Sequence, residues 1–357
     1  MDSIKSDPFA ALRYREFTFF GIGSFFFTTA ILIQEVVLGY EIYRVSHDPL
    51  ALGLVGLAEA IPYISLALFG GHYADRYDKK KIILISLLVI ITGSFILHWA
   101  TLPATRALHP DSFLLTIIYS VVALIGFARG FYSPAASSLK AFLTPRDVYP
   151  NATSWYSTFW QAGAILGPGL AGFLYAWLGM AGTMWVVIAA FGVVLVLFSF
   201  IKRKPVPVST QEASVWQSIR EGLGFVFQNK ILLYSISLDL VAVLFGGVVA
   251  ILPVFADDLL HVGAEGLGVL RAAPSVGAVL TILTTAVYSP VKKAWLNMLI
   301  AVAGFGLATL IFALSTNFWL SVTMLFLTGA FDSISVVVRQ AILQIVPPDE
   351  IRGRVVS

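Results

Sequence analysis

The sequence predicts an all-α polytopic membrane protein. Of its 357 residues, 58% are hydrophobic and only 12% are charged, whereas soluble domains average about 45–50% and about 25%. The apolar residues form continuous runs of roughly 20, the length at which a helix crosses a bilayer core about 30 Å thick. Strands of a transmembrane barrel are about ten residues long and alternate in polarity. These observations exclude both a water-soluble domain and a barrel.

Ten apolar runs are bounded by charges, prolines or glycines. The expected spans are residues 17–39, 50–73, 82–100, 113–133, 153–178, 181–201, 231–255, 265–287, 294–314 and 317–343. The residues before the first run lack the short apolar core and small-residue cleavage site of a signal peptide, so we expect the first span to act as an uncleaved insertion signal. Six spans thus precede a polar stretch, and four follow it.

The distribution of lysine and arginine agrees with ten spans, because it alternates between sides as the positive-inside rule requires. Arg44 and Arg106 fall on one side, and Arg129, Arg271 and Arg339 fall within spans. The other eighteen of the 23 lie on the opposite side: Lys5, Arg13, Arg15, Arg76, Lys79, Lys80, Lys81, Lys140, Arg146, Lys202, Arg203, Lys204, Arg220, Lys230, Lys292, Lys293, Arg352 and Arg354. We therefore expect a cytoplasmic N-terminus. The basic residues behind the net charge of +3 serve mainly to set this orientation, so we do not expect a nucleic-acid partner.

Residues 202–230 separate the two groups of spans. They predict a cytoplasmic linker between a six-helix bundle, residues 1–201, and a four-helix bundle, residues 231–357. Within the linker, three-and-four spacing of large apolar residues is typical of an amphipathic helix at a membrane surface; these residues are Trp216, Ile219, Leu223 and Val226. An ordinary charged linker that carries a surface helix is the simpler interpretation.

A weak internal repeat relates the two halves, as in many transporters. Residues 56–62, GLAEAIP, match residues 268–274, GVLRAAP, and the same offset places Lys80-Lys81 on Lys292-Lys293. Two copies of a six-helix unit would need twelve spans. The second bundle is therefore expected to be truncated by two helices.

The loop after the second span reads GHYADRYDKKK from residue 71. It resembles the loop motif of the major facilitator superfamily, G-x-x-x-D-R-x-G-R-K; the matching residues are Gly71, Asp75, Arg76, Lys79 and Lys80. The motif would allow close approach of a helix at Gly71, hydrogen bonds from a helix N-terminus to Asp75, and contact of the basic run with anionic lipid headgroups. The alternative is an ordinary positive-inside loop, and Asp78 departs from the motif's second glycine.

Two further segments carry the same resemblance. Residues 163–172, GAILGPGLAG, look like the superfamily's antiporter motif G-x-x-x-G-P-x-x-G-G at Gly163, Gly167, Pro168 and Gly172, although Ala171 replaces one glycine. Small residues allow close helix packing, and proline favours a kink. The alternative is that these residues serve close packing alone, without a role in antiport. Residues 126–135, GFARGFYSPA, are similar to the superfamily's embedded-arginine motif.

Together with VPPDEIRGRV near the end, these segments make the chain most like the enterobactin-exporter and macrolide-efflux group. The resemblance implies a fold of two six-helix bundles in a bacterial cytoplasmic membrane. It also implies alternating access around a midplane cavity and export coupled to protons.

Ionisable side chains inside membrane spans are costly and often mark a transport pathway or a buried pair. There are seven: Glu35, Glu59, Arg129, Asp239, Arg271, Asp332 and Arg339. Asp239 and Asp332 are expected to line the cavity, since the resemblance places their spans there. Burial favours the neutral form of a carboxyl group, which lets an embedded acid bind and release a proton near neutral pH.

The other five have competing interpretations. Glu35 and Arg339 can either serve the pathway or snorkel to the membrane surface. Arg129 can anchor an anionic group or modulate a nearby acid, or it can form a static salt bridge between helices. Glu59 and Arg271 occupy matching repeat positions with opposite charge, which suggests that they pair across the two halves in one transport state.

No sequence pattern supports an enzyme. There is no cysteine, the five histidines lack metal-ligand spacing, and no phosphate-binding glycine-rich loop occurs, so we expect neither a cofactor nor a metal site. The sequence predicts a monomeric secondary transporter that exports a small amphipathic compound, such as a drug, macrolide or siderophore-like molecule, with protons and membrane lipids as its other partners. The alternative is a non-transporting scaffold or an inactive truncated transporter.

Overall fold

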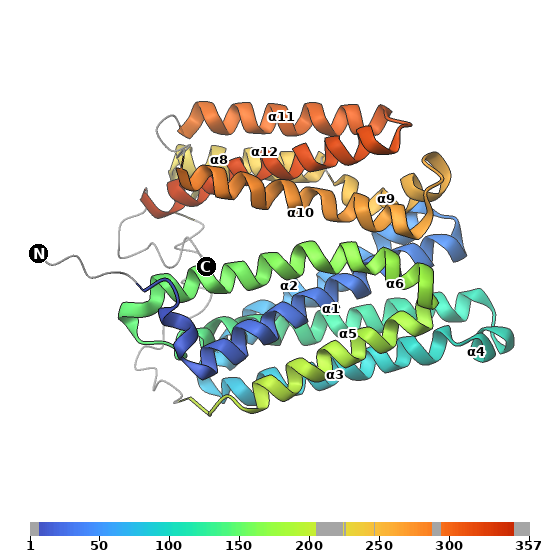
Figure 1. The fold of residues 1–357 in the computed structure, drawn as a ribbon, viewed down its shortest axis with the longest axis horizontal. Coiled ribbons are helices and arrows are strands. Elements are labelled where there is room, and N and C mark those ends of the chain that lie inside the picture. Colours follow the sequence, from blue (N-terminus) through green and yellow to red (C-terminus); the bar gives the residue numbers. More distant parts are fainter. Residues whose placement is uncertain (1–6, 205–223, 225, 246, 288–293, 346–357) are drawn as a thin grey trace, which may run out of the picture. The chain divides into compact units, whose positions relative to one another are not determined.

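The structure, a computed structural model, describes residues 7–204, 224, 226–245, 247–287 and 294–345. These residues form helices joined by short connections, and no strand occurs among them (Figure 1). The prediction of an all-α protein is confirmed. Contacts divide the chain into a first unit, Met1–Ser209 with Pro253–Asp257 and Val262–Gly268, and a second unit, Thr210–Leu252 with Asp258–His261 and Val269–Ser357.

Six α-helices and two short 3-10 helices build most of the first unit. They are η1 (Ala10–Arg13), α1 (Arg15–Ser46), α2 (Pro49–Arg76), α3 (Lys79–Thr101), α4 (Pro103–Leu108), α5 (Asp111–Lys140), η2 (Arg146–Val148) and α6 (Tyr149–Ser199). Helix α1 packs along α6, α2 packs along α5, and α3 contacts both α5 and α6. Large apolar side chains such as Phe20, Leu87 and Phe191 are fully buried between them.

Helix α6 contains two predicted spans, 153–178 and 181–201. They are separated at Gly179, whose φ of 64° and ψ of −176° interrupt the helical backbone. A side chain at this conformation would clash with the backbone, whereas glycine adopts it readily. Gly179 therefore supplies the reversal between two helices that the sequence predicts as separate spans.

The second unit holds the helices after the linker. They are α8 (Lys230–Phe245), η3 (Val248–Ile251), α9 (Leu252–Val254), the π-helix η4 (Phe255–Leu259), α10 (Gly263–Val287), α11 (Ala294–Leu314) and α12 (Phe318–Ile345). Parts of α9, η4 and α10, within Pro253–Asp257 and Val262–Gly268, belong to the first unit. Helix α11 packs on α12, and α8 contacts both. The predicted span 231–255 is not one helix, because α8 ends just before the helix-breaking pair Gly246-Gly247.

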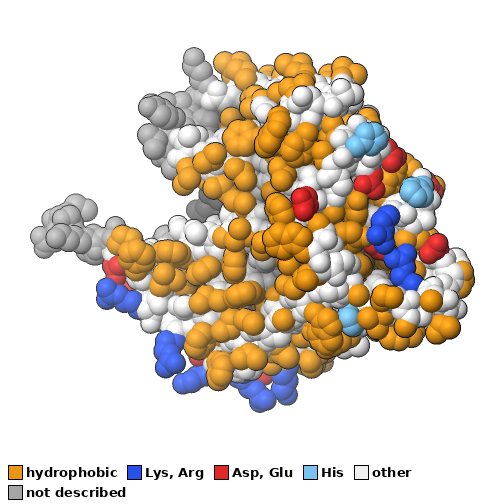
Figure 2. Space-filling model, turned by 45° about the vertical axis from the view of Figure 1, so that its right-hand side comes forward, with side chains coloured by type: hydrophobic (Ala, Val, Ile, Leu, Met, Phe, Trp, Pro, Cys, Tyr) orange, Lys and Arg blue, Asp and Glu red, His pale blue; other side chains and the backbone are white. Residues whose placement is uncertain are grey.

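Eight of the described helices are long and apolar enough to cross a membrane, with α6 counted once. Large hydrophobic side chains cover much of the face shown in Figure 2. Ile64, Phe69 and Ile85 are each more than 60% exposed, as expected of helices that face lipid. The chain is a multi-pass membrane protein. The predicted boundaries at residues 201 and 230 remain predictions, and most of the predicted linker helix lies outside the described residues.

Candidate functional site

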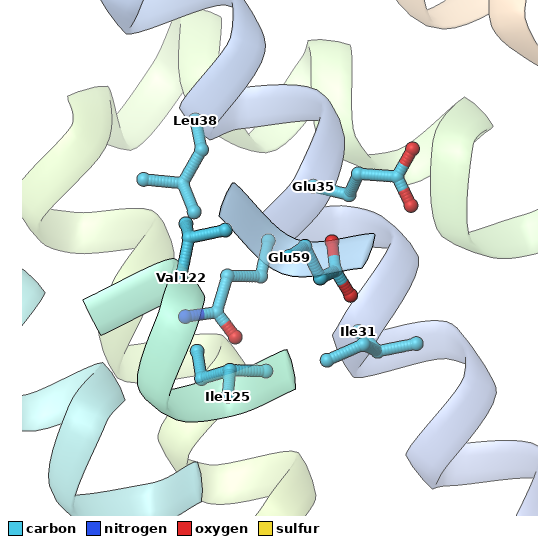
Figure 3. Close-up of a pocket in the computed structure, with 7 residues that line it drawn as sticks. Ile31, Glu35, Leu38, Glu59, Val122 and Ile125 are labelled. Carbon is cyan, nitrogen blue, oxygen red and sulfur yellow. The ribbon is translucent and has the colours of Figure 1, made fainter. Parts of the chain in front are cut away.

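A small pocket lies within the first unit, between α1, α2 and α5 (Figure 3). Helix α1 contributes Ile31, Gln34, Glu35 and Leu38; Glu59 comes from α2, and Val122 and Ile125 come from α5. The four residues of α1 follow the spacing i, i+3, i+4 and i+7, which places them on one face of the helix. The cavity of about 20 Å³ has room for one water-sized group.

Two of the predicted ionisable residues form an ion pair beside this pocket, and Glu59 also lines it. Arg129 on α5 donates a hydrogen bond from Nη1 to Oε1 of Glu59 on α2, and the two side chains are 29% and 23% exposed. The Arg129 guanidinium also lies 5.6 Å from the ring centroid of Tyr63 on α2, within the range of a cation–π interaction. Arg129 thus contacts α2 through both Glu59 and Tyr63, as expected of a salt bridge between helices.

The embedded-arginine motif explains why this pair can form. A Cβ atom on Gly126 would lie 2.4 Å from the backbone oxygen of Glu59, so only a glycine allows α5 to approach α2 this closely. Arg129 follows Gly126 by three residues and lies on the same side of α5. The glycine brings the backbones together, and the arginine then reaches the carboxylate. The predicted pairing of Glu59 with Arg271 stays a prediction.

Glu35 and Gln34 complete the polar part of the pocket. The side chain of Glu35 is exposed, and its carboxylate and that of Glu59 extend toward the same side in Figure 3. The two are close enough for electrostatic repulsion. Gln34 is buried; its Oε1 accepts a hydrogen bond of 3.5 Å from Ser94 on α3, while its Nε2 has no hydrogen-bond partner among the described residues.

This arrangement can exchange one cation for another. The Glu59 carboxylate is held by a guanidinium, and the Glu35 carboxylate also lines the pocket, whose other walls are Gln34 and buried aliphatic groups. Binding a proton at Glu59 would weaken its ion pair with Arg129. The chemistry available is therefore binding and proton exchange.

The other four embedded residues lie on helices after the linker. Asp239 is on α8, Arg271 on α10, and Asp332 and Arg339 on α12. Asp332 is exposed and Arg339 is partly buried. Their separation of seven residues along one helix corresponds to about 10 Å of rise, too far for a direct pair. Their expected roles in the pathway stay predictions.

The loop motif lies where α2 ends and α3 begins. Gly71, Asp75 and Arg76 are on the last turns of α2, and Arg76 is exposed. Lys79 is buried with its ammonium nitrogen 5.5 Å from the ring centroid of Phe142, and Lys80 donates to the backbone oxygen of Ser199 at 2.6 Å.

Asp78, the departure from the motif, caps α3. It accepts hydrogen bonds from the backbone nitrogens of Lys80 and Lys81 at 3.0 and 3.4 Å, and it pairs with Arg203 at 3.3 Å. Its φ of −62° suits any residue, so this turn does not require the motif's glycine. The aspartate supplies a helix cap instead.

The antiporter motif lies on α6. A Cβ atom on Gly163 would lie 2.9 Å from the backbone oxygen of Phe25, and one on Gly167 would lie 2.9 Å from Cβ of Leu32. These glycines therefore allow α6 to pack tightly on α1. Pro168 and Gly172 follow on the same helix, which continues through the proline. The close packing expected of this motif is present; its link to antiport stays a prediction.

One buried acid, Glu41, lies outside the predicted spans. Its carboxylate is fully buried and accepts hydrogen bonds from Arg106 on α4 at 2.7 Å, from Arg44 at 3.0 Å and from the Tyr175 hydroxyl on α6. The predicted first span ended at residue 39, whereas α1 continues to Ser46. The i, i+3 pair of Glu41 and Arg44 was the available signal. Arg44 and Arg106 are the two arginines assigned to the outer side.

Comparisons with known proteins agree with this architecture. The family model described as Major Facilitator Superfamily matches residues 17–357. The multidrug efflux pump Tap of Mycolicibacterium fortuitum is 26% identical over 336 residues, which cover 91% of this chain and 80% of Tap. The enterobactin exporter EntS of Escherichia coli is 25% identical over 325 residues, 90% of this chain and 75% of EntS.

A solved structure shows the same fold. The bacterial homologue of the lysosomal transporter Spinster, in an inward-facing and unoccupied conformation, superposes with a TM-score of 0.68 over 97% of this chain and 78% of that one, at 17% identity. The resemblance found in the sequence motifs is confirmed by the family match, and the expectation of a transporter rather than an enzyme is confirmed with it. The chain belongs to the Major Facilitator Superfamily and is a membrane transporter.

Proposed function

We propose that this chain exports small amphipathic compounds from a bacterial cytoplasm in exchange for protons, by alternating access. The observation that carries the proposal is the Glu59–Arg129 pair beside a pocket inside a bundle of membrane helices. The relatives named as efflux pumps and exporters support the outward direction. Drugs, macrolides and siderophore-like molecules are the compound classes to test.

The proposed coupling uses competition for one carboxylate. Glu59 binds either the Arg129 guanidinium or a proton, and the choice changes how strongly α2 and α5 are held together. Such a change can favour one of two helix arrangements when its free energy is comparable with the difference between them. Asp239 and Asp332, on helices after the linker, are further acids through which protons could pass.

The distribution of lysine and arginine supports an orientation with a cytoplasmic N-terminus in the inner membrane. The proposed transporter works as a monomer. Its basic loop, which includes the exposed Arg76, contacts anionic lipid headgroups.

Transport by purified protein in liposomes tests this proposal. We expect a pH gradient to drive accumulation of at least one dye, macrolide or catecholate siderophore, and we expect accumulation to stop when the gradient is collapsed. In Glu59→Gln the side chain mimics the protonated acid, so gradient-driven accumulation should be lost while exchange of labelled for unlabelled substrate continues. Asp147→Asn, at an exposed position on η2, is the matched control for loss of a carboxylate.

The outcomes separate the alternatives. Export that ignores a collapsed proton gradient contradicts proton coupling. Normal gradient-driven accumulation by Glu59→Gln contradicts the role of Glu59. Neither export nor exchange, in protein that is correctly inserted, would favour a non-transporting scaffold.

A further inference from the structure

The pocket between α1, α2 and α5 is small, and most of its wall is buried and aliphatic (Figure 3). Ile31, Leu38, Val122 and Ile125 are each at most 8% exposed. The free space of about 20 Å³ is enough for one water molecule, which needs about 10–15 Å³. Cavities that stay dry are apolar, whereas polar ones hold ordered water. The polar groups in the wall therefore decide what the pocket contains.

Gln34 on α1 contributes a buried amide to this wall. The residue is 1% exposed, and its Nε2 has no hydrogen-bond partner in the described part of the chain. Its Oε1 is weakly bonded too, because it shares the single hydroxyl proton of Ser94 with the backbone oxygen of Ile90, at 3.5 and 3.0 Å. Buried side-chain amides are nearly always paired with protein groups or with ordered water. Gln34 thus indicates a ligand that accepts a hydrogen bond.

Glu59 on α2 supplies the second polar partner. Its bond to Arg129 uses Oε1, so Oε2 can accept from another donor. The charged groups that act on Glu59 are Arg129 on α5 and Glu35 on α1, and the Tyr63 ring on α2 lies against Arg129. One water molecule can accept from Nε2 of Gln34 and donate to Glu59. A metal cation or an ammonium group cannot accept from Nε2, and the acids repel an anion.

We propose that this pocket holds one ordered water molecule between Gln34 and Glu59, and that this water delivers the proton to Glu59. The inference rests on the proposed function, in which Glu59 exchanges Arg129 for a proton, and it assigns Gln34 as the residue that positions the proton donor. Gln34 is a positioning residue, because it acts on Glu59 only through the water.

The proton transfer needs no other reactant. The water receives a proton from solvent at the side of the pocket where Glu35 is exposed. It passes one of its own protons to Oε2 of Glu59, so one O–H bond of the water breaks as a new one forms on the carboxylate, and the water is left neutral. The neutral acid then holds Arg129 less strongly.

Infrared difference spectroscopy of the full chain in lipid vesicles detects this water without any transport. Subtraction of spectra at high and low pH leaves the bands of groups that change when embedded acids titrate. Water that carries the heavy oxygen isotope lowers the O–H stretching frequency of a bound water and leaves the N–H bands of the protein in place. We expect one isotope-sensitive band in the wild type and its loss in Glu59→Gln.

Two substitutions examine the role of Gln34. Gln34→Met removes the amide and keeps a side chain of similar length. We expect loss of the isotope-sensitive band and about tenfold slower gradient-driven accumulation, the effect of one lost hydrogen bond, while exchange of labelled for unlabelled substrate keeps its wild-type rate. Ser94→Ala removes the other contact of the same amide, on α3 and outside the pocket wall. It should keep the band and both rates.

An isotope-sensitive band that is missing from the wild type, or that survives in Gln34→Met, would overturn the inference. Equal slowing of accumulation and exchange by Gln34→Met and Ser94→Ala would also overturn it, because Gln34 would then serve only to join α1 to α3. The spectrum is independent of transport. A band lost in Gln34→Met, in a protein whose export ignores the proton gradient, would refute the proposed function and leave the water site intact.

Discussion

Replacement of Glu41 by glutamine tests the buried acid that joins α1, α4 and α6. The substitution keeps the shape of the side chain but removes its charge, while Arg106, Arg44 and Tyr175 remain as donors. Glu41 is fully buried and the Arg106 side chain is 29% exposed. A hydrogen bond between such charged groups contributes about 1.5–3 kcal/mol.

The other two donors contribute less. The Arg44 side chain is 48% exposed, so its pair with Glu41 is worth about 0–1 kcal/mol. Tyr175 can still donate to the oxygen of a glutamine, and only the gain from the negative charge is lost. We therefore expect Glu41→Gln to lower the free energy of unfolding by about 2–4 kcal/mol.

Unfolding in mixed micelles with increasing SDS, followed by tryptophan fluorescence, measures this change. Arg44→Gln is the matched control and should cost no more than about 1 kcal/mol. Arg106→Gln should cost more than Arg44→Gln, because it leaves the buried carboxylate with less compensation. In a double-mutant cycle, Glu41 and Arg106 should show a coupling energy of at least about 1 kcal/mol. A loss below 1 kcal/mol in Glu41→Gln, or additive effects in the cycle, would refute the argument.

Two further predictions concern helix packing and capping. Gly126→Ala should force α5 away from α2, because the added carbon would meet the Glu59 backbone oxygen at 2.4 Å; we expect a loss of about 1–3 kcal/mol in the same SDS assay together with slower transport. Gly192→Ala, where nothing lies within 4 Å of the added carbon, is its control, and equal effects of the two changes would contradict the close-approach argument. Asp78→Ala should lower stability by about 1 kcal/mol through loss of the α3 cap. Asp78→Ser should restore most of that loss, and failure to do so would indicate that the pair with Arg203 matters more than the cap.

The sequence by itself determined the fold class, since 58% hydrophobic residues in continuous runs leave no alternative to membrane helices. It also determined the family, because its motifs place glycine, proline and charge where helices approach closely or end. Gly126 and Arg129 belong to such a motif, and the structure shows the close approach and the ion pair that their spacing allows. Hydropathy and motif spacing depend on residues that are close together in the chain, so a short segment is enough to reveal them.

Only the tertiary structure decided which charges meet. Glu59 forms an ion pair with Arg129, which lies on another helix 70 residues further along the chain. Glu41 lies two residues beyond the predicted end of the first span, and its partners Arg106 and Tyr175 are 65 and 134 residues away. Hydropathy gives the length of a span but not its rotation or its neighbours. Pairing of buried charges depends on both, so it is fixed by packing between helices far apart in the chain.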